Sequence, residues 1–525
     1  MCGIVAVSRR SGSNFPVTEF VYNALKSLEY RGYDSHGVAY FDESTNREVY
    51  RNIGSIESEI KCKFNPDIAL GHTRWATHGE VSKENCHPIS GIDQIFIVHN
   101  GQIENIEDYS SLEDKASKKV ASDTQIFATF LEFSGYVDNS PKMFSRIFSH
   151  VKGRNAFVVY MWGKMYAWSD GLPLYAVYED GNLLIVSDPV ALIGYSDKAY
   201  KLPERTLIDD EYILPASNIF TVPSVKPEQS DNMIKEIEEQ GLISLDRFDI
   251  QGFWGTDIKR MAFIGCGSSY NAALFAKMAI ESKTHIAVDC HYASNIEGAQ
   301  VYDVDAFVFI SQSGHTADII DAALYVNKRK KEFAITIALT NNADSPLSNM
   351  CNETVPLKCG TEYSVAATKS FIASCIYAFE IALMSNLLTY YSLDPKNGIN
   401  YVFDSRKKIM EIADEIGAAH NCLFLGQGPL YVTAREAALK VKEVAYIHAE
   451  AILSAELKHG PLALIDKEMP VIFFTSGHQS RKERIKANIE QVVSRGGKIY
   501  VVSDSDEFQR SGFNFLNVGE TPCLL

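Results

Sequence analysis

Two kinds of hydrophobic pattern follow one another along the chain, and the change falls near residue 225. Up to about Val222 the apolar runs are short and bounded by turn residues, which is typical of β-strands. Helical spacing is confined to about 17–29, 120–134 and 139–151, so residues 2–222 are predicted to form one layered α+β domain. Strands are expected at Ile4–Ser8, Gly37–Phe41, Ile95–His99, Ala156–Trp162, Met165–Ser169, Pro173–Tyr178 and Leu183–Ser187.

Beyond a polar, proline-bearing segment the pattern becomes strand, glycine turn and helix, repeated along the chain. Residues 223–248 are expected to be a linker that leads into a charged helix from about 232 to 247. A strand followed by Gly265 and Gly267 recurs as a strand followed by Gly426 and Gly428, and two further strands recur at a similar separation. This periodicity predicts an internal duplication of a parallel, doubly wound α/β unit, with copies at 249–395 and 396–525.

Composition and charge narrow the class of protein. The chain has 525 residues and a net charge of −16, which disfavours binding to nucleic acid or to an anionic membrane surface. The most apolar stretch, 373–388, is short and contains Glu380, so a buried helix is expected there rather than a membrane span. The N-terminus has no apolar signal-peptide core, and the ten cysteines have no CxxC spacing. A soluble, cytoplasmic protein without a disulfide framework is therefore expected.

The first candidate for chemistry is the extreme N-terminus. Removal of Met1 would leave Cys2 as the first residue, with its thiol beside a free α-amine. The amine has an ordinary pKa of about 7.7–8.0 and can take the thiol proton, so this pair suits attack on an amide carbonyl. A small residue after the start methionine is also common, and the dipeptide alone leaves both interpretations open.

Polar residues elsewhere in the first domain fit an amino-acid amide as substrate. Arg74 can pair with a carboxylate, Thr77 can add a neutral hydrogen bond, and Asp123 at a helix start can hold an ammonium group. Asn100 and Gly101 are predicted to form a sharp turn after a strand, where an amide and a backbone N–H could bind an oxyanion. Taken singly, each of these residues is equally well an ordinary turn, cap or surface charge.

Four histidines at 72, 78, 87 and 99 raise the alternative of a metal site. Their spacing matches no usual ligand motif, so neither a metal nor another cofactor is expected.

Two turns in the first α/β copy are candidates for a phosphate site. The sequence SQSGHT at 311–316 brings hydroxyl groups and backbone N–H groups to a helix start, and Gly267-Ser268-Ser269 is a second such turn. Serine and threonine also cap ordinary helices, so the turns alone leave anion binding open. The matching turn in the second copy, 426–429, has no hydroxyl cluster. A GxxxxGK(S/T) loop is absent, which disfavours nucleotide hydrolysis.

Together these motifs resemble the N-terminal-nucleophile glutamine amidotransferases, and within them the glutamine–fructose-6-phosphate aminotransferase branch. The resemblance rests on CGI at 2–4, RGYDS at 31–35, HTRWATHG at 72–79, His87-Pro88, HNG at 99–101, SDT at 122–124, GTE at 360–362, VAATK at 365–369, LKVKE at 439–443 and ELKHGPLALI at 456–465. It implies a four-layer αββα N-terminal-nucleophile-hydrolase-like domain followed by two sugar-isomerase (SIS) subdomains.

The resemblance also implies roles for individual residues. Cys2 would be the nucleophile and Trp75 the gate of an internal ammonia channel, with the oxyanion hole formed by Asn100 and Gly101. The residues implied to hold glutamine are Arg74, Thr77, His78, His87 and Asp123. Those implied to hold fructose 6-phosphate are Ser268, Ser269, Ser311, Gln312, Ser313, Thr316 and Val365.

For the sugar reaction, Glu443 would move a proton between C1 and C2 and Lys440 would assist it. The two residues lie three apart, a spacing that by itself is typical of a solvated ion pair. His459 would open the sugar ring in a neighbouring subunit, so at least a homodimer is expected.

The sequence departs from the family pattern in three places. It ends at Leu525, a few dozen residues before the family's usual end, and no residue takes the role of the family's imine-forming lysine. His315 stands where glutamate is usual and Ala367 where serine is usual. Two hypotheses follow: an amidotransferase that makes glucosamine 6-phosphate, or a fragment or weakened enzyme that binds sugar phosphate and retains only glutaminase activity.

Overall fold

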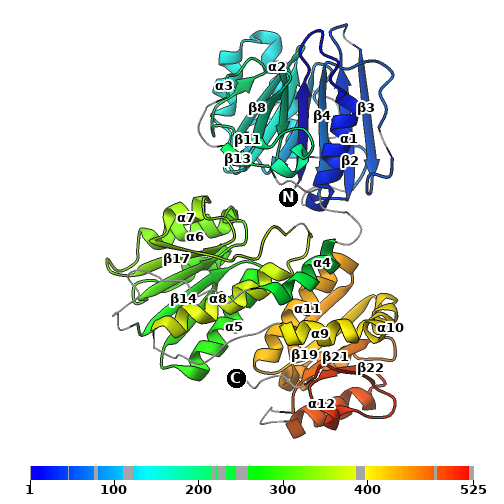
Figure 1. The fold of residues 1–525 in the computed structure, drawn as a ribbon, viewed down its shortest axis with the longest axis vertical. Coiled ribbons are helices and arrows are strands. Elements are labelled where there is room, and N and C mark those ends of the chain that lie inside the picture. The colour runs from blue at the N-terminus through cyan, green and yellow to red at the C-terminus, as the bar shows by residue number, and fades with distance from the viewer. Residues whose placement is uncertain are drawn as a thin grey trace. The chain divides into compact units, whose positions relative to one another are not determined.

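The chain forms two compact units, Met1–Glu228 and Gln229–Leu525, and their boundary lies inside the segment 223–248 (Figure 1). The structure is a computed structural model. It describes residues 2–44, 46–58, 60–75, 81–109, 122–214, 219–222, 232–243, 258–362, 364–385, 396–477 and 482–519.

The larger sheet of the first unit is antiparallel and has β1 near its centre. Its strand order is β13-β11-β9-β10-β1-β4-β2-β3. The bounds are β1 Gly3–Ser8, β2 Ser35–Phe41, β3 Arg47–Ile53, β4 Ile68–Arg74, β9 Tyr175–Glu179, β10 Asn182–Val186, β11 Lys198–Lys201 and β13 Ile219–Thr221. The strands predicted at 4–8, 37–41, 173–178 and 183–187 are confirmed to within two residues. β3 was not predicted, because it is a polar, largely exposed edge strand without an apolar face.

The smaller sheet of the first unit has the order β12-β8-β7-β6-β5. Its strands are β5 Ile89–Ser90, β6 Ile95–Gly101, β7 Asn155–Met161, β8 Lys164–Asp170 and β12 Ile208–Asp209. The helices are α1 Val17–Leu28, α2 Asp123–Val137 and α3 Pro141–Phe148. All three were predicted. α3 is shorter than expected because Pro141 sets its first turn and the chain leaves the helix after Phe148.

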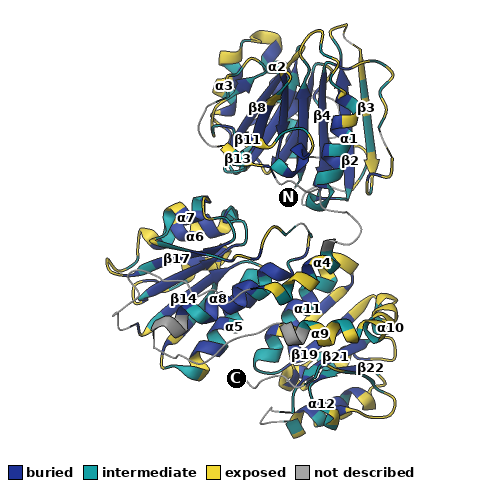
Figure 2. Cartoon of the chain, viewed as in Figure 1, coloured by how far each residue is buried: buried dark blue, intermediate teal, exposed yellow. Residues whose placement is uncertain are grey.

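The two sheets of the first unit pack face to face, and helices cover their outer faces. Ile4 and Leu70 of the larger sheet share one apolar core with Phe96 and Val98 of the smaller sheet. Ile95 on the opposite side of β6 packs instead with residues of α2 and α3. The central strands of both sheets are accordingly buried on both faces, as Figure 2 shows for β4 and β8. Because side chains alternate along a strand, neighbouring residues of β6 serve different layers.

The second unit contains two parallel sheets with the same topology. Their orders are β15-β14-β16-β17-β18 and β20-β19-β21-β22-β23. The first comprises β14 Arg260–Gly265, β15 Ala287–Tyr292, β16 Ala306–Ile310, β17 Ile335–Thr340 and β18 Glu353–Pro356. The second comprises β19 Asn421–Gly426, β20 His448–Leu453, β21 Pro470–Thr475, β22 Lys498–Ser503 and β23 Asn514–Asn517. The predicted duplication is confirmed. Even the turn glycines match, with φ +55° at Gly267 and +59° at Gly428.

The helices of the second unit are α4 Asn232–Glu239, α5 Ser268–Lys283, α6 Ala317–Asn327, α7 Pro346–Met350, α8 Lys369–Ser385, α9 Lys396–Asp404, α10 Arg406–Gly417, α11 Pro429–Ala445 and α12 Lys482–Ser494. Among them, α4, α5, α6, α8 and α11 were predicted, whereas α7, α9, α10 and α12 were not. The charged helix expected from 232 to 247 ends earlier. It gives way after Glu239 to a single 3-10 turn containing Gly241, a residue that disfavours a continued helix.

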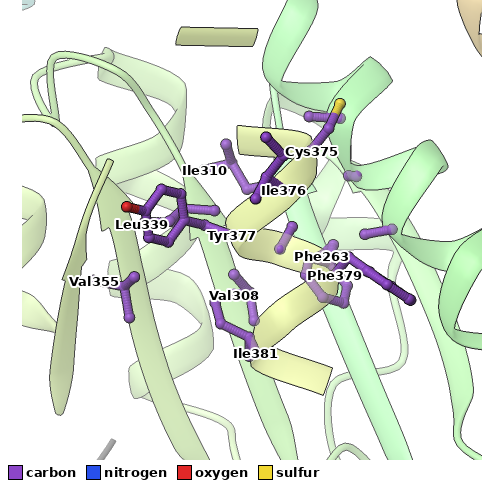
Figure 3. Packing of buried hydrophobic residues seen from close by; sticks show 14 of the residues in the cluster. Phe263, Val308, Ile310, Leu339, Val355, Cys375, Ile376, Tyr377, Phe379 and Ile381 are labelled. Carbon is purple, nitrogen blue, oxygen red and sulfur yellow. The ribbon is translucent and has the colours of Figure 1, made fainter. Parts of the chain in front are cut away.

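The apolar stretch at 373–388 begins inside α8, as a buried helix. Cys375, Ile376 and Phe379 belong to one buried apolar core with Phe263 and Val308 of the first parallel sheet (Figure 3). Among the described residues no helix is long and apolar enough to cross a membrane.

Candidate active sites

Cys2 lies where the two sheets of the first unit face each other. It directly precedes β1, and Gly3 pairs with Thr73, next to Arg74 at the end of β4. Ile4 points into the core between the sheets, so alternation turns Cys2 toward the smaller sheet as well. Arg74, the predicted carboxylate binder, is 6% exposed and belongs to the same inner face.

Asn100 lies beside the backbone of Cys2. The Cys2 N–H donates to Asn100 Oδ1 over 3.2 Å, which leaves the Asn100 Nδ2 group as a donor. The sharp turn predicted for Asn100 and Gly101 is wrong. β6 continues through both residues, because they pair with Ala156 and Asn155 of β7. Gly101 has φ +129°, a backbone conformation that favours glycine.

The Cys2 thiol lies against the residue that follows β4. Its Sγ is 3.8 Å from the carbonyl oxygen of Trp75, whose ring stands edge-on to Tyr33. Burial raises the pKa of the Cys2 thiol above its ordinary value, and the opposing effects of Arg74 and Arg31 are smaller. At neutral pH the sulfur is therefore protonated, and attack on a carbonyl needs a base.

Asp123 begins α2, as predicted, and the helix is capped by the Ser122 hydroxyl. The Asp123 carboxylate accepts the N–H of Ile103 at 3.0 Å and that of Thr124 at 2.7 Å. The bond to Ile103 ties the helix start to the end of β6, so the predicted ammonium binder lies near the predicted oxyanion hole. Thr77 and His78 lie outside the described residues.

Three of the four histidines form a buried stack. The ring centroids of His72 and His87 are 4.4 Å apart, and those of His87 and His99 are 6.4 Å apart. His72 Nε2–H donates to the His99 carbonyl, and the His99 N–H donates to His87 Nδ1. Burial lowers the pKa of all three rings, to about 3 for His72. His87 therefore supports the strand that carries Asn100, and its role in binding glutamine stays a prediction.

In the second unit the two hydroxyl-bearing turns lie at the same edge of one sheet. β14 and β16 are parallel neighbours, so Ser268 and Ser269 after β14 and the 311–316 turn after β16 meet at the carboxyl ends of the strands. Within the second turn, Ser311 Oγ lies 2.9 Å from Thr316 Oγ1 and accepts the Gly314 N–H. Much of the hydroxyl cluster thus holds the turn itself together.

Other residues of the 311–316 turn fix the loop backbone. The Ser313 hydroxyl accepts the N–H of His315, and the His315 Nδ1–H donates to the Ser313 carbonyl. The Gln312 carbonyl accepts from Asn341 N–H and from the Thr340 hydroxyl. These bonds leave the position of the helix start at Ala317 well defined.

A charged helix of the second copy reaches the first copy at this edge. Lys440 Nζ is 2.6 Å from Glu443 Oε2 and donates to Ser268 Oγ at 3.1 Å. The Lys440 side chain is only 17% exposed. With the Glu443 side chain 30% exposed, the ion pair is partly buried rather than fully solvated.

Glu436 is the residue of this cluster that sequence reasoning missed. Its carboxylate accepts from the Ser268 hydroxyl at 2.7 Å and from Asn271 Nδ2 at 2.8 Å, and it lies 3.4 Å from Lys440 Nζ. A signal was present, because Glu436, Lys440 and Glu443 occupy positions i, i+4 and i+7 on one helix face. The contact with Ser268, 168 residues away, could not be read from that spacing.

Two further predicted residues, Val365 and His459, are exposed. Val365 is 37% exposed in the loop before α8, where the Glu362 carboxylate accepts the N–H and hydroxyl of Thr368. His459 is exposed and ends the 3-10 segment Ser454–His459, which follows β20 and in which Ser454 and Leu457 are buried.

Comparison with known proteins identifies both parts of the second unit. A family model described as the SIS domain matches residues 256–382 and 415–512. The solved C-terminal domain of glucosamine-fructose-6-phosphate aminotransferase from Francisella tularensis is similar, with 30% identity and a TM-score of 0.50. That alignment covers 57% of this chain and 92% of the solved domain.

Two full-length relatives extend the similarity over nearly the whole chain. Glutamine–fructose-6-phosphate aminotransferase (isomerizing) of Francisella tularensis is 32% identical over 98% of this chain and 92% of its own length. The protein of the same name from Oceanobacillus iheyensis is 33% identical over 96% of this chain and 90% of its own length. The chain therefore belongs to the family of isomerizing glutamine–fructose-6-phosphate aminotransferases, enzymes that carry SIS domains.

Proposed function

We propose that this protein hydrolyses glutamine at Cys2 and transfers the released ammonia to fructose 6-phosphate, forming glutamate and glucosamine 6-phosphate. The names of its relatives support this substrate pair. The observation that carries the proposal is the bond between the Cys2 backbone nitrogen and Asn100 Oδ1, because it aligns an N-terminal thiol with a side-chain amide donor.

The first step uses the α-amine that removal of Met1 would expose. Since the pKa of the Cys2 thiol is raised by burial, the amine is the group that takes the thiol proton as sulfur attacks the glutamine carbonyl. Asn100 Nδ2 and the Gly101 N–H stabilise the oxyanion. The C–N bond then breaks, ammonia leaves with the transferred proton, and water hydrolyses the thioester to glutamate.

Substrate selection follows from the charges around this thiol. Arg74 would pair with the α-carboxylate of glutamine, and Asp123 with its ammonium group. Thr77, His78 and His87 complete the proposed glutamine set, and Trp75 would gate the exit of ammonia. The two facing sheets with outer helices support assignment of residues 2–222 to an N-terminal-nucleophile-hydrolase-like fold.

The second unit would isomerise the sugar. The turns around Ser268, Ser269, Ser311, Gln312, Ser313 and Thr316, with Val365, would hold the phosphate ester through hydroxyl and backbone N–H groups at helix starts. Glu443 would carry the proton between C1 and C2. Lys440 supports that role because its ammonium lies between two carboxylates and can offset the charge that develops on the sugar oxygens.

His459 would act on the sugar of a second copy of this chain. Its exposure at the end of Ser454–His459 supports a role outside its own subunit. The proposed assembly is therefore at least a homodimer, with the two SIS copies at 249–395 and 396–525.

The decisive experiment measures glucosamine 6-phosphate from pure protein with glutamine and fructose 6-phosphate. We expect product from the wild-type chain, and no glutamine-dependent product from Cys2→Ala, whereas ammonium salts still support the reaction in that variant. Glutamine hydrolysis without any amino sugar, at a rate that fructose 6-phosphate leaves unchanged, would replace the proposal by the second hypothesis. Intact mass of the active enzyme must show the loss of Met1.

A further inference from the structure

Asn155 is a fully buried polar residue to which nothing above assigns a task. It opens β7 directly opposite Gly101, and its side chain is 0% exposed. Its Nδ2 group donates to the Lys152 carbonyl at 3.1 Å, which turns Oδ1 toward His99 Nε2 at 2.9 Å. Burying an amide is costly unless both of its ends are bonded, and here both are.

The bond from Asn155 fixes the protonation of His99. Because Asn155 Oδ1 is an acceptor, His99 Nε2 must carry the hydrogen, and His99 Nδ1 accepts from the Thr124 hydroxyl at 2.8 Å. The imidazole also stacks on Phe157 with centroids 4.3 Å apart. Every polar atom of the His99 side chain is thus held, immediately before Asn100 in the chain.

The Asn155 side chain also lies close to the backbone of Gly101. A Cβ atom at Gly101 would lie 2.8 Å from Asn155 Oδ1 and 2.2 Å from the Arg154 carbonyl oxygen. The asparagine oxygen therefore lies directly behind the Gly101 backbone, which has φ +129°. One side chain contacts the residues on both sides of Asn100.

We propose that Asn155 is a positioning residue for the glutaminase reaction: it holds His99 and Gly101 so that the donors of Asn100 and Gly101 stay aimed at the oxyanion. This inference rests on the proposed hydrolysis of glutamine at Cys2. Asn155 itself does not touch the substrate. Its loss should act on the transition state, in which the oxyanion forms, and leave the binding of glutamine nearly unchanged.

The first unit offers a matched control in Asn182. This asparagine is also 0% exposed and opens the strand β10. Its Nδ2 group donates to the carbonyl three residues earlier, at Glu179, and its Oδ1 accepts the Arg10 N–H. Asn182→Ala likewise removes one bond donated to a backbone carbonyl and one bond accepted by Oδ1, here from a backbone N–H, without touching β6.

The test compares glutamine hydrolysis by full-length wild type, Asn155→Ala and Asn182→Ala. We expect Asn155→Ala to lower kcat by about tenfold or more, with KM for glutamine within about twofold, because small misplacement of catalytic groups costs rate. Asn182→Ala should keep kcat. A rise in KM alone, or an equal loss of kcat in both variants, would overturn the inference. Absence of hydrolysis by the wild type would instead refute the proposed function.

Alkylation of Cys2 by iodoacetamide tests the reactivity of the nucleophile independently of the oxyanion hole. That displacement forms no oxyanion, so the rate, followed by mass spectrometry of the N-terminal peptide, should be equal in all three proteins. Loss of alkylation in parallel with kcat would contradict the assignment.

One further variant guards against misfolding. Should Asn155→Ala not fold, Asn155→Ser takes its place, because a serine is too short to reach His99.

Discussion

At the scale of single residues, the side of a strand decides what a side chain does. On β6, Asn100 faces the larger sheet and contacts Cys2, whereas its neighbour His99 faces α2 and bonds to Thr124. On β4, His72 faces inward and donates to the His99 carbonyl. The candidate site is thus built from alternate residues of two facing strands.

His72 should make the first unit sensitive to acid. Burial lowers its pKa to about 3, whereas an unfolded histidine titrates near 6.5, so between these values only the unfolded chain binds the proton. Stability is therefore complete above about pH 6.5 and falls with decreasing pH, by up to ~1.4 kcal/mol per pH unit. Buried His87 and His99 add losses of the same sign.

His72→Gln should weaken this dependence, since an amide can still donate but does not titrate. Urea unfolding at pH 7 and pH 5 measures the difference in the free energy of unfolding between the two pH values. Tryptophan fluorescence reports on the first unit, because three of the four tryptophans lie there. Exposed His150→Gln is the control. An unchanged difference between the two pH values in His72→Gln would show that another group is responsible.

At the scale of elements, α2 holds the hairpin that leads into β6. Glu132 is 0% exposed and accepts backbone N–H groups from Ile92, Asp93, Gln94 and Ile95. The buried carboxylate therefore accepts the backbone N–H groups that the tight turn would otherwise leave without a hydrogen-bond partner. The register of β6, and with it the position of Asn100, depends on this contact between a helix and a turn.

Glu132→Gln should destabilise the first unit by about 3 kcal/mol, because the amide NH2 group would face backbone donors. The midpoint of urea unfolding, followed by tryptophan fluorescence, reports the change. Asp138 is an exposed carboxylate that accepts a single backbone N–H. Asp138→Asn therefore serves for comparison and should shift the midpoint little. Equal shifts in the two variants would mean that the Glu132 bonds contribute nothing specific.

The helix α11 of the second SIS copy contacts the first copy through charged side chains, since Glu436 and Lys440 both bond to Ser268. Glu436→Gln should lower conversion of fructose 6-phosphate by about 10-fold to 100-fold, since Lys440 would then lose one of its two carboxylates and neutralise Glu443, the proposed base, more strongly. Sugar turnover without glutamine is the measurement. Glu411→Gln, in the exposed Lys408–Glu411 pair of α10, is the matched control. Equal activity of Glu436→Gln and wild type would exclude this role.

At the scale of the whole molecule, duplication has produced two copies with one topology and different chemistry. The turn after β14 carries Ser268 and Ser269, whereas the matching turn after β19 carries Gln427 and Pro429. The second copy contributes α11 instead, whose Lys440 reaches Ser268. The candidate sugar site is therefore shared between the copies, and neither copy holds all of it.

Mixing of inactive subunits tests the proposed exchange of His459. His459→Ala and Glu443→Gln should each abolish sugar conversion alone. Refolded together in equal amounts, they should recover about a quarter of wild-type activity, because half of the dimers are mixed and each has one intact site. Recovery close to zero would place His459 in the reaction of its own subunit, whereas activity of His459→Ala alone would place it outside the reaction.

The sequence predicted most elements because their patterns are local. The strands β1, β7 and β14 and the helices α1, α5 and α6 follow from apolar periodicity and glycine turns. Edge strands such as β3 were missed, since a half-exposed strand has no strong alternation. The end of α4 was misjudged because it is set by a single glycine, and the extent of β6 because it is set by the pairing with β7. Neither is encoded in the apolar periodicity.

What the sequence determined by itself is the family, the order of domains, the duplication and the types of reactive group, since these are properties of residues and of their spacing. Only the tertiary structure decided which groups meet. The contacts of Asn155 with His99, of Glu436 with Ser268 and of Glu132 with the 92–95 turn join residues 37 to 168 positions apart. No local pattern encodes such pairs, because burial and strand register bring them together only when the whole unit folds.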